Sequence, residues 1–176
     1  TFIYVTHDQA EAMTMADRVA VMMDGDLLQV DTPSNVYKNP TDIRVAEFIG
    51  SPKINILAAQ VDGAGKITVG DRMLSGLYSS VKGEDIQVGV RPEALTLSDI
   101  KAEGLPCRIV HHENMGSEAY FHAELNIGGR VISRMDASAL DTFATGQEAS
   151  IVIDPQNALL FGKEGQRLAS KIEVAA

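Results

Sequence analysis

His7 is the residue whose type and position first suggest chemistry in this sequence. It follows residues 1–5, whose β-branched and aromatic side chains predict a strand, and it precedes a helix predicted over about residues 9–16. In α/β proteins, ligands bind beyond the carboxyl ends of strands, and a helix N-terminus favours anions. A histidine at that junction can donate a hydrogen bond to a phosphate oxygen or to an attacking water. By position alone, an ordinary polar turn histidine is the more common interpretation.

Arg91 and Glu93 form a second candidate, because they flank Pro92 directly after an apolar run. Proline fixes its own φ and ends a strand, so both charged side chains flank a rigid turn. A surface ion pair that holds such a turn is worth under about 1 kcal/mol and is the ordinary interpretation. The alternative is a role at an interface of a regulatory domain or in a solute pocket.

Three histidines and two glutamates form a third candidate, since they fall on two neighbouring predicted strands. They are His111, His112, Glu113, Glu118 and His122. Histidines and carboxylates that meet across a hairpin can bind a divalent metal. Consecutive strand residues point to opposite faces, so only one of His111 and His112 can join His122. We therefore expect a half-buried polar strand surface here and no metal site.

The composition argues against several classes of function. The chain has 176 residues, of which 15 are basic and 24 are acidic, and it has no Trp, five Phe and four Tyr. A nucleic-acid surface needs clustered basic residues and stacking aromatic rings, so we expect no nucleic-acid partner. Cys107 is the single cysteine, which prevents an intramolecular disulfide, and we expect it to be a buried small apolar residue. The methionines at positions 13, 15, 22 and 23 are expected to fill a core.

The first fifty residues predict short helices and a hairpin. Either Thr6 with Gln9 or Asp8 with Glu11 has the capping-box spacing that would open the first helix. The other elements expected here are a hairpin of residues 18–23 and 27–30 around Asp-Gly, short helices over about 33–37 and 43–48, and a Gly-Ser-Pro linker at 50–52.

After residue 52 the pattern changes to short strand-like stretches separated by turn residues. A spacing near ten residues is typical of a β-barrel or sandwich. One helical turn is expected within residues 135–144, and the polar residues beyond Gly165 are expected to fray. The predicted strands are residues 56–61, 66–69, 86–90, 107–112, 118–125, 130–134, 149–153 and 158–161.

Several runs of residues resemble one family over nearly the whole chain. The run Val-Thr-His-Asp-Gln-Ala-Glu-Ala-Met at residues 5–13 resembles the switch-histidine segment of ABC transporter ATPases. Gly-Val-Arg-Pro-Glu at 89–93 and Met-Gly-Ser-Glu at 115–118 resemble the C-terminal regulatory region of the ATP-binding subunit of carbohydrate importers. That class handles solutes such as maltose, trehalose or glycerol-3-phosphate. The similarity also covers residues 16–22, 25–30, 32–37, 45–52, 154–155 and 160–161.

The resemblance implies roles for particular residues. His7 would contact the γ-phosphate of ATP and orient the attacking water in a complete subunit that also binds Mg²⁺. Arg91, Glu93, Gly116 and Glu118 would belong to the regulatory region or to its interface.

The chain lacks the phosphate-binding loop that such an ATPase needs. That loop reads G-x-x-x-x-G-K-[ST], and the nearest match, Gly65-Lys66, is followed by Ile67 and has Gln60 where the first glycine belongs. We therefore expect no complete cofactor site in these residues and no ATP hydrolysis by them. Because the sequence starts at Thr1 inside an apolar run, we expect it to be a piece of a longer ATPase.

The fold expected is mainly β. An OB-like barrel regulatory and dimerisation domain would span residues 51–176, after an α/β remnant of the ABC ATPase core over residues 1–50 that includes its last strand. The resemblance implies a homodimer formed through the regulatory domain, membrane permease subunits as partners of the parent protein, and a cytoplasmic location on the inner face of the membrane. The alternative is a domain of an importer ATPase that senses a sugar or an oxyanion.

Overall fold

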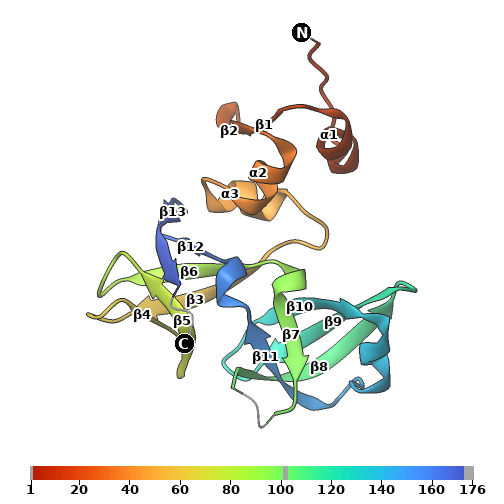
Figure 1. Cartoon of the computed structure of the whole chain (residues 1–176), viewed down its shortest axis with the longest axis vertical. Coiled ribbons are helices and arrows are strands. Elements are labelled where there is room, and N and C mark those ends of the chain that lie inside the picture. Colours follow the sequence, from red (N-terminus) through yellow and green to blue (C-terminus); the bar gives the residue numbers. More distant parts are fainter. Residues whose placement is uncertain (1, 101–102, 173–176) are drawn as a thin grey trace.

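The computed structural model describes residues 2–100 and 103–172 and shows a small helical part above two β-sheets (Figure 1). The helical part begins with α1 (Gln9–Met15), which is one residue shorter than predicted. Its N-cap is Asp8, whose Oδ1 accepts hydrogen bonds from the N–H groups of Ala10 at 2.8 Å and Glu11 at 3.2 Å. Of the two predicted caps, the structure therefore uses Asp8, but the reciprocal half of a capping box is not formed, because the Asp8 N–H donates to Thr6 Oγ1 at 3.0 Å.

The strand predicted over residues 1–5 is wrong for the residues that the structure describes. Residues 2–5 belong to no strand, and Phe2, Ile3 and Val5 are each at least 84% exposed. A strand exists only through hydrogen bonds to a neighbour, and no described strand lies beside this segment. Thr1 lies outside the described residues. The apolar composition was therefore insufficient to predict a strand.

The rest of the helical part confirms the local predictions. A hairpin joins β1 (Val19–Met23) to β2 (Asp26–Asp31), and its turn holds Asp24 at φ 50° and Gly25 at φ 89°, as a tight turn requires. The helices α2 (Pro33–Lys38) and α3 (Ile43–Phe48) follow. A small core joins these elements; its buried residues are Val19, Val21, Val36, Val45 and Ile49.

A seven-stranded antiparallel sheet follows, in the order β13-β12-β6-β3-β4-β5-β14. Only Ala169 separates β13 from β14, although these strands lie on opposite edges of the sheet. This short segment therefore brings both edges together and nearly closes the sheet into a barrel. The prediction that residues beyond Gly165 fray is wrong for 167–172. The strands are β3 (Asn55–Val61), β4 (Lys66–Val69), β5 (Arg72–Ser79), β6 (Asp85–Val90), β12 (Ala158–Phe161), β13 (Arg167–Leu168) and β14 (Ser170–Ile172).

A five-stranded antiparallel sheet, in the order β10-β9-β8-β11-β7, makes up the remainder. Its edge strands also approach each other, because Ser133 Oγ donates to the Leu95 carbonyl and Leu97 N–H donates to Met135 Sδ. The chain is thus mainly β and barrel-like, as predicted, but it forms two such sheets where one barrel was expected. The strands are β7 (Leu95–Ser98), β8 (Leu105–Asn114), β9 (Glu118–Leu125), β10 (Arg130–Asp136) and β11 (Glu148–Ile153), and the 3-10 turns are η1 (Pro92–Ala94), η2 (Ala137–Asp141) and η3 (Pro155–Asn157).

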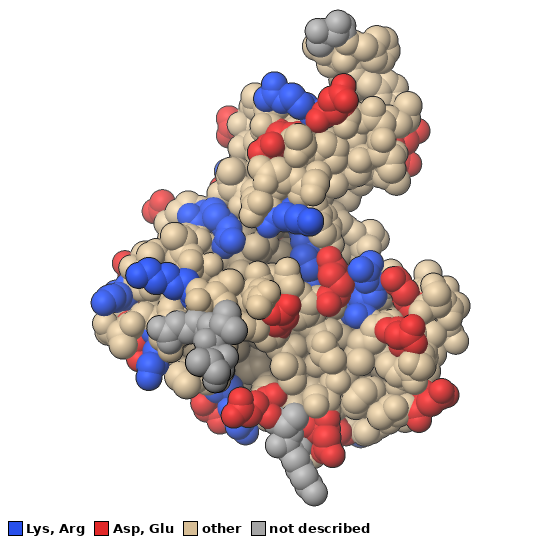
Figure 2. Space-filling view, viewed as in Figure 1, with Lys and Arg blue, Asp and Glu red and all other residues tan. Residues whose placement is uncertain are grey.

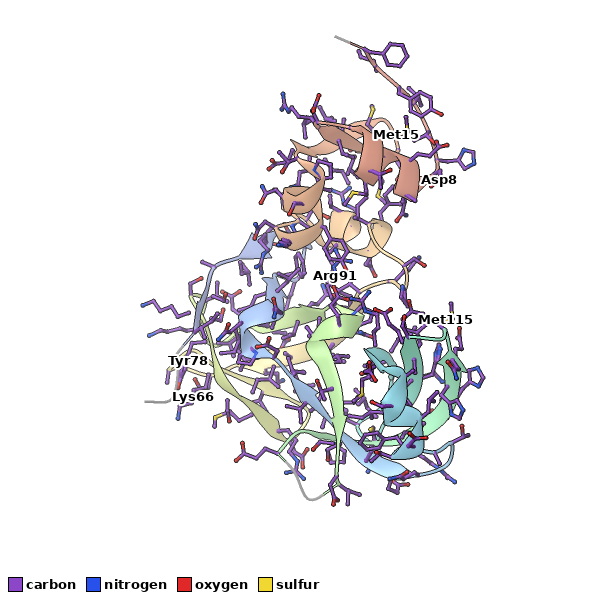
Figure 3. The ribbon with its side chains drawn as sticks, turned by 45° about the vertical axis from the view of Figure 1, so that its right-hand side comes forward. Asp8, Met15, Lys66, Tyr78, Arg91 and Met115 are labelled. Atoms are coloured by element: carbon purple, nitrogen blue, oxygen red, sulfur yellow. The ribbon has the colours of Figure 1, made fainter. Side chains whose placement is uncertain are left out.

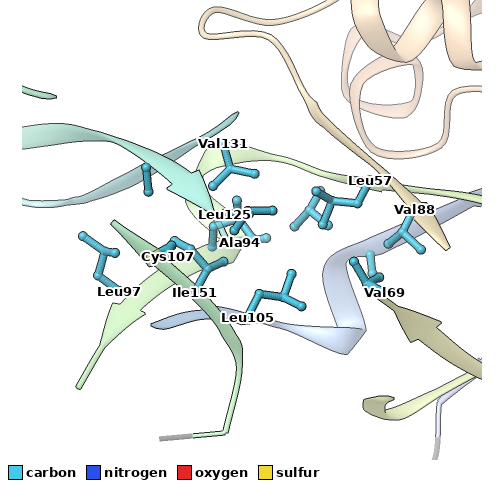
Figure 4. Close-up of a cluster of buried hydrophobic side chains, with 14 of the residues drawn as sticks. Leu57, Val69, Val88, Ala94, Leu97, Leu105, Cys107, Leu125, Val131 and Ile151 are labelled. Atoms are coloured by element: carbon cyan, nitrogen blue, oxygen red, sulfur yellow. The ribbon is translucent and has the colours of Figure 1, made fainter. Parts of the chain in front are cut away.

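Both sheets contribute to one hydrophobic core (Figure 4). Leu57 and Val88 of the larger sheet belong to the same buried cluster as Leu105 and Ile151 of the smaller one. Cys107 is fully buried in this cluster, as expected. Two methionines contradict the core-filling prediction, since Met15 is 78% exposed and Met22 is 60% exposed, whereas Met13 packs against the small N-terminal core. Among the described residues, no helix is long and apolar enough to cross a membrane.

Candidate functional site

Arg91 lies where the helical part meets the sheets, between the end of β6 and the start of η1 (Figure 3). Pro92 occupies the first position of η1, which stops the strand and turns the chain. The Arg91 side chain points back toward the helices and is 5% exposed. A guanidinium that is buried to this extent must find hydrogen-bond partners inside the protein.

The partners of Arg91 are backbone carbonyls at the C-terminal ends of two helices. Its Nη1 donates to the carbonyls of Ala46, at 3.0 Å, and Ile49, and its Nη2 donates to the carbonyl of Tyr37 at 3.1 Å. Carbonyls in the last turn of a helix lack intrahelical donors and carry partial negative charge. One cation therefore binds the ends of α2 and α3 to the start of η1.

Tyr37 extends this contact toward Glu93. The Arg91 guanidinium lies 4.1 Å above the Tyr37 ring, and the Tyr37 hydroxyl donates to Glu93 Oε1 at 2.6 Å. Burial, together with the hydrogen bond and the charge of Glu93, raises the pKa of Tyr37 to about 12. Burial lowers the pKa of Arg91. Among the described residues no ion pair joins Arg91 to Glu93, so the surface ion pair first considered for this turn is not formed.

A shallow hollow of about 360 Å³ lies beside Glu93. It brings Glu93 together with Glu118, which lies 3.9 Å from Arg134 Nε. Arg134 was not singled out from the sequence, and no local pattern marks it; only the antiparallel pairing of β9 with β10 places it opposite Tyr120, near Glu118. Gly116 does not line this hollow. It adopts φ 94° in the β8–β9 turn, where glycine is favoured.

His7 lies apart from Arg91, on an exposed bend just before α1. Among the described residues its ring makes no hydrogen bond. The fit of the described residues to a nucleotide is poor. Gly65 lies in the turn between two antiparallel strands, where its N–H donates to Asp62 O, and Lys66 begins β4, so no helix follows the pair. A phosphate-binding loop instead connects a strand to a helix, so no step of nucleotide chemistry follows from these residues.

The histidine cluster forms as the strand pattern predicts. In the β8–β9 pairing His111 is opposite His122, whereas His112 is opposite the buried Phe121, so only His111 joins His122. His122 Nε2 lies 2.8 Å from Glu113 Oε1. In the part of the chain that the structure describes, no three His, Cys, Asp or Glu side chains are grouped so as to hold a metal ion.

Comparison with known proteins gives both a domain and a set of relatives. Residues 88–161 match the TOBE domain. The chain is 36% identical over 174 residues to the osmoprotective compounds uptake ATP-binding protein GgtA of Synechocystis sp., which covers 93% of this chain and 47% of that protein. It is 34% identical over 180 residues to the sn-glycerol-3-phosphate import ATP-binding protein UgpC of Chromobacterium violaceum, covering 100% of this chain and 47% of that protein.

A third relative and one solved structure complete the comparison. The maltose/maltodextrin import ATP-binding protein MalK of Photorhabdus laumondii is 36% identical over 174 residues, with 94% of this chain and 47% of that protein covered. A crystal structure of the cytoplasmic molybdate-binding protein ModG matches 60% of this chain and 94% of its own, with a TM-score of 0.45 and 19% identity. This similarity is too distant to bear on a ligand of this protein. The chain spans about half the length of the curated relatives it matches. It contains a TOBE domain and belongs to the ATP-binding proteins of ABC importers, to whose C-terminal regulatory part it corresponds.

Proposed function

We propose that this chain is the regulatory and dimerisation part of an ATP-binding subunit that powers carbohydrate import. The observation that carries the proposal is that similarity to an importer ATP-binding protein covers 100% of the chain. The similarity therefore includes the helical part, the residues that contact Arg91 and both sheets. The printed names of two relatives, for sn-glycerol-3-phosphate and maltose or maltodextrin import, support a carbohydrate-type solute.

In this proposal the chain divides near the Gly-Ser-Pro turn at residues 50–52. Residues 1–50 are the end of the ATPase core, and residues 51–176 are the regulatory domain. One buried cluster supports this division, because Val19, Val21, Val36, Val45 and Ile49 pack together without any residue after the turn. A second cluster joins the two parts, since Ala46 packs against Ile54, Leu159 and Phe161. Arg91 then acts inside the subunit, because its burial keeps it from a partner.

His7 serves as the switch histidine only in the complete subunit, where ATP and Mg²⁺ would bind. The described residues do not form a phosphate cradle, and phosphoryl transfer depends on positioning by several groups at once. The piece of 176 residues therefore should not hydrolyse ATP by itself.

The partners proposed are a second copy of the subunit and the membrane permease, which would place the protein on the inner face of the membrane. Glu93 and Glu118 are available to a partner because they line an open hollow, and Gly116 shapes the adjacent turn. On the face shown in Figure 2, acidic and basic residues are interspersed. This mixed charge distribution and the excess of acidic residues, 24 against 15 basic ones, support the expectation that nucleic acid is not a partner.

ATP hydrolysis by the complete subunit with its permease tests the proposal. We expect hydrolysis that is stimulated by a carbohydrate, absent in the isolated 176-residue chain, and abolished by His7→Ala. His111→Ala is a matched control, since His111 is also exposed but lies in β8. Hydrolysis by the isolated chain above a buffer blank, or stimulation by molybdate or sulfate instead of a carbohydrate, would contradict the proposal. Light scattering tests the dimer, which a monomer at high concentration would refute.

A further inference from the structure

Gln9 connects the His7 loop to the turn that Arg91 holds. Gln9 is the first residue of α1 and lies two residues after His7. Its side-chain Nε2 donates to the carbonyl of Phe48, and its Oε1 accepts from the N–H of Gly50 at 3.0 Å. The amide group thus makes two hydrogen bonds to a segment that is about forty residues away in the chain, with separations of 39 and 41 residues.

Gln9 and Arg91 act on the two halves of one missing helical hydrogen bond. In a continuing α-helix, the N–H of Gly50 would donate to the carbonyl of Ala46. Here the N–H of Gly50 is donated to Gln9, and the carbonyl of Ala46 accepts from Arg91. Because a helix end leaves such groups without partners, both side chains satisfy groups that burial would otherwise make costly.

The turn between these two side chains has little room to move. Gly50 adopts φ 115°, and a Cβ atom added there would lie 3.0 Å from Arg91 Nη1 and 3.2 Å from Tyr37 Cε2. Arg91 also restrains Ile49, because its Nη1 donates a hydrogen bond to the Ile49 carbonyl. The α1 side is fixed as well, since Asp8 caps the helix next to Gln9. Arg91 on one side and Gln9 on the other therefore bind the same turn, which links the regulatory domain to the loop that carries His7.

We propose that Gln9 and Arg91 together hold the His7 loop on the regulatory domain, which makes Gln9 a positioning residue for His7. The positioning role of Gln9 rests on the proposed function of His7. The hydrogen bonds of Gln9 and Arg91 to the turn do not depend on that function. Gln9 is suited to the role because an amide both donates and accepts, whereas the carboxylate of glutamate only accepts. Gln9→Glu therefore keeps the shape of the side chain and removes the hydrogen bond to Phe48.

Amide hydrogen exchange of the whole chain measures the connection without nucleotide. We expect Gln9→Glu and Arg91→Lys each to raise exchange over residues 10–12 by about tenfold, which corresponds to about 1.4 kcal/mol, the scale of one hydrogen bond. Arg91→Lys should raise exchange at Gly50 as well, whereas in Gln9→Glu the carboxylate still accepts from the Gly50 N–H. The double variant should raise exchange little more than either single variant, because both changes release the same turn. Arg167→Lys is the matched control, since Arg167 donates to the Leu160 carbonyl in the β12 region and should leave residues 10–12 unchanged.

Two results would overturn the inference. One is faster exchange at Gly50 in Arg91→Lys with no change over residues 10–12. The other is an Arg167→Lys variant that speeds exchange over residues 10–12 as much as Arg91→Lys does, since that would indicate general destabilisation. In the complete subunit, Gln9→Glu should also lower ATP hydrolysis while leaving the amount of folded protein unchanged. If the complete subunit hydrolyses no ATP, the proposed function fails, whereas the exchange result still decides whether Gln9 and Arg91 are connected.

Discussion

Replacing Arg91 by methionine tests whether its hydrogen bonds hold the two parts of the chain together. The change removes the guanidinium and keeps much of the side-chain length. Three buried or half-buried carbonyls, those of Tyr37, Ala46 and Ile49, then lose their donor. Water does not reach this junction readily, because Arg91 itself is only 5% exposed.

The helices cannot replace these donors by themselves. The N–H of Thr41, four residues after Tyr37, is donated to Gln29 Oε1 at 3.0 Å. The N–H of Gly50, four residues after Ala46, is donated to Gln9. The carbonyls that lose Arg91 therefore remain without intrahelical partners until the junction rearranges.

The cost follows from the number of groups that lose a partner. A buried acceptor without a donor costs about 1–3 kcal/mol, so three carbonyls give at least about 3 kcal/mol. The lost contact with the Tyr37 ring adds about 0.5–2 kcal/mol. Against this, methionine removes a buried charge and the Arg91 Nε, which has no hydrogen-bond partner among the described residues. We expect a net destabilisation of about 3 kcal/mol, or roughly 6–12 °C in Tm at about 2–4 °C per kcal/mol.

Differential scanning calorimetry and urea unfolding followed by circular dichroism measure this change. Arg44→Met is the matched control, because the Arg44 side chain is 51% exposed and, among the described residues, forms an ion pair only with Asp42, at 2.9 Å. An exposed pair is worth about 0–1 kcal/mol, so the control should change Tm little. If Arg91→Met costs no more than Arg44→Met, the hydrogen bonds to the helix ends do not stabilise the junction, and the reasoning is wrong.

Three further predictions concern the same region and the core. Gly50→Ala should destabilise by about 1–3 kcal/mol, because its φ of 115° is strained for alanine and the added Cβ crowds Arg91. Gly25→Ala, at φ 89°, carries the same kind of strain without crowding and should cost less; thermal unfolding compares the two variants. Tyr37 should stay protonated at pH 11, where a tyrosine with the ordinary pKa near 10 is ionised, because its pKa is raised to about 12. Its contribution to stability is therefore complete below pH 10 and is lost as the pH rises toward 12. Absorbance titration of the Tyr37→Phe variant against the parent protein checks this. Cys107 should react with a thiol reagent only after unfolding, since burial raises its pKa to about 11; equally fast labelling of the native chain would contradict this.

Where a local signal was strong, the sequence predicted the element accurately. The Asp24-Gly25 turn identified the first hairpin, because positive φ at both residues is a property of those residue types. The helix expected over about residues 43–48 is α3, and Asp42 caps it through a side chain that accepts from the Arg44 N–H. Strands β9 and β12 have the predicted bounds. These features need no knowledge of distant residues.

The errors occur where an element depends on a neighbour. The segment of residues 2–5 has strand-like composition but no partner, and the polar pair β13 and β14 has little strand signal but two partners. Strand β5 was missed because Gly76, at φ 77°, interrupts it, although pairing with β4 and β14 maintains it. Pairing overrides composition because ladder hydrogen bonds, rather than propensity, define a strand.

In the candidate site, too, some features follow from the local sequence and others depend on distant residues. The sequence by itself determined that this is a mainly β chain with a short helical start, and it singled out His7, Arg91, Glu93 and Glu118 as residues of interest. It did not determine that Arg91 is buried against two helix ends or that Gln9 binds the opposite side of the same turn. Those contacts join residues that are between 39 and 54 positions apart in the chain. Only the tertiary structure decides them, because a hydrogen bond to a backbone carbonyl leaves no trace in the type of the residue that accepts it.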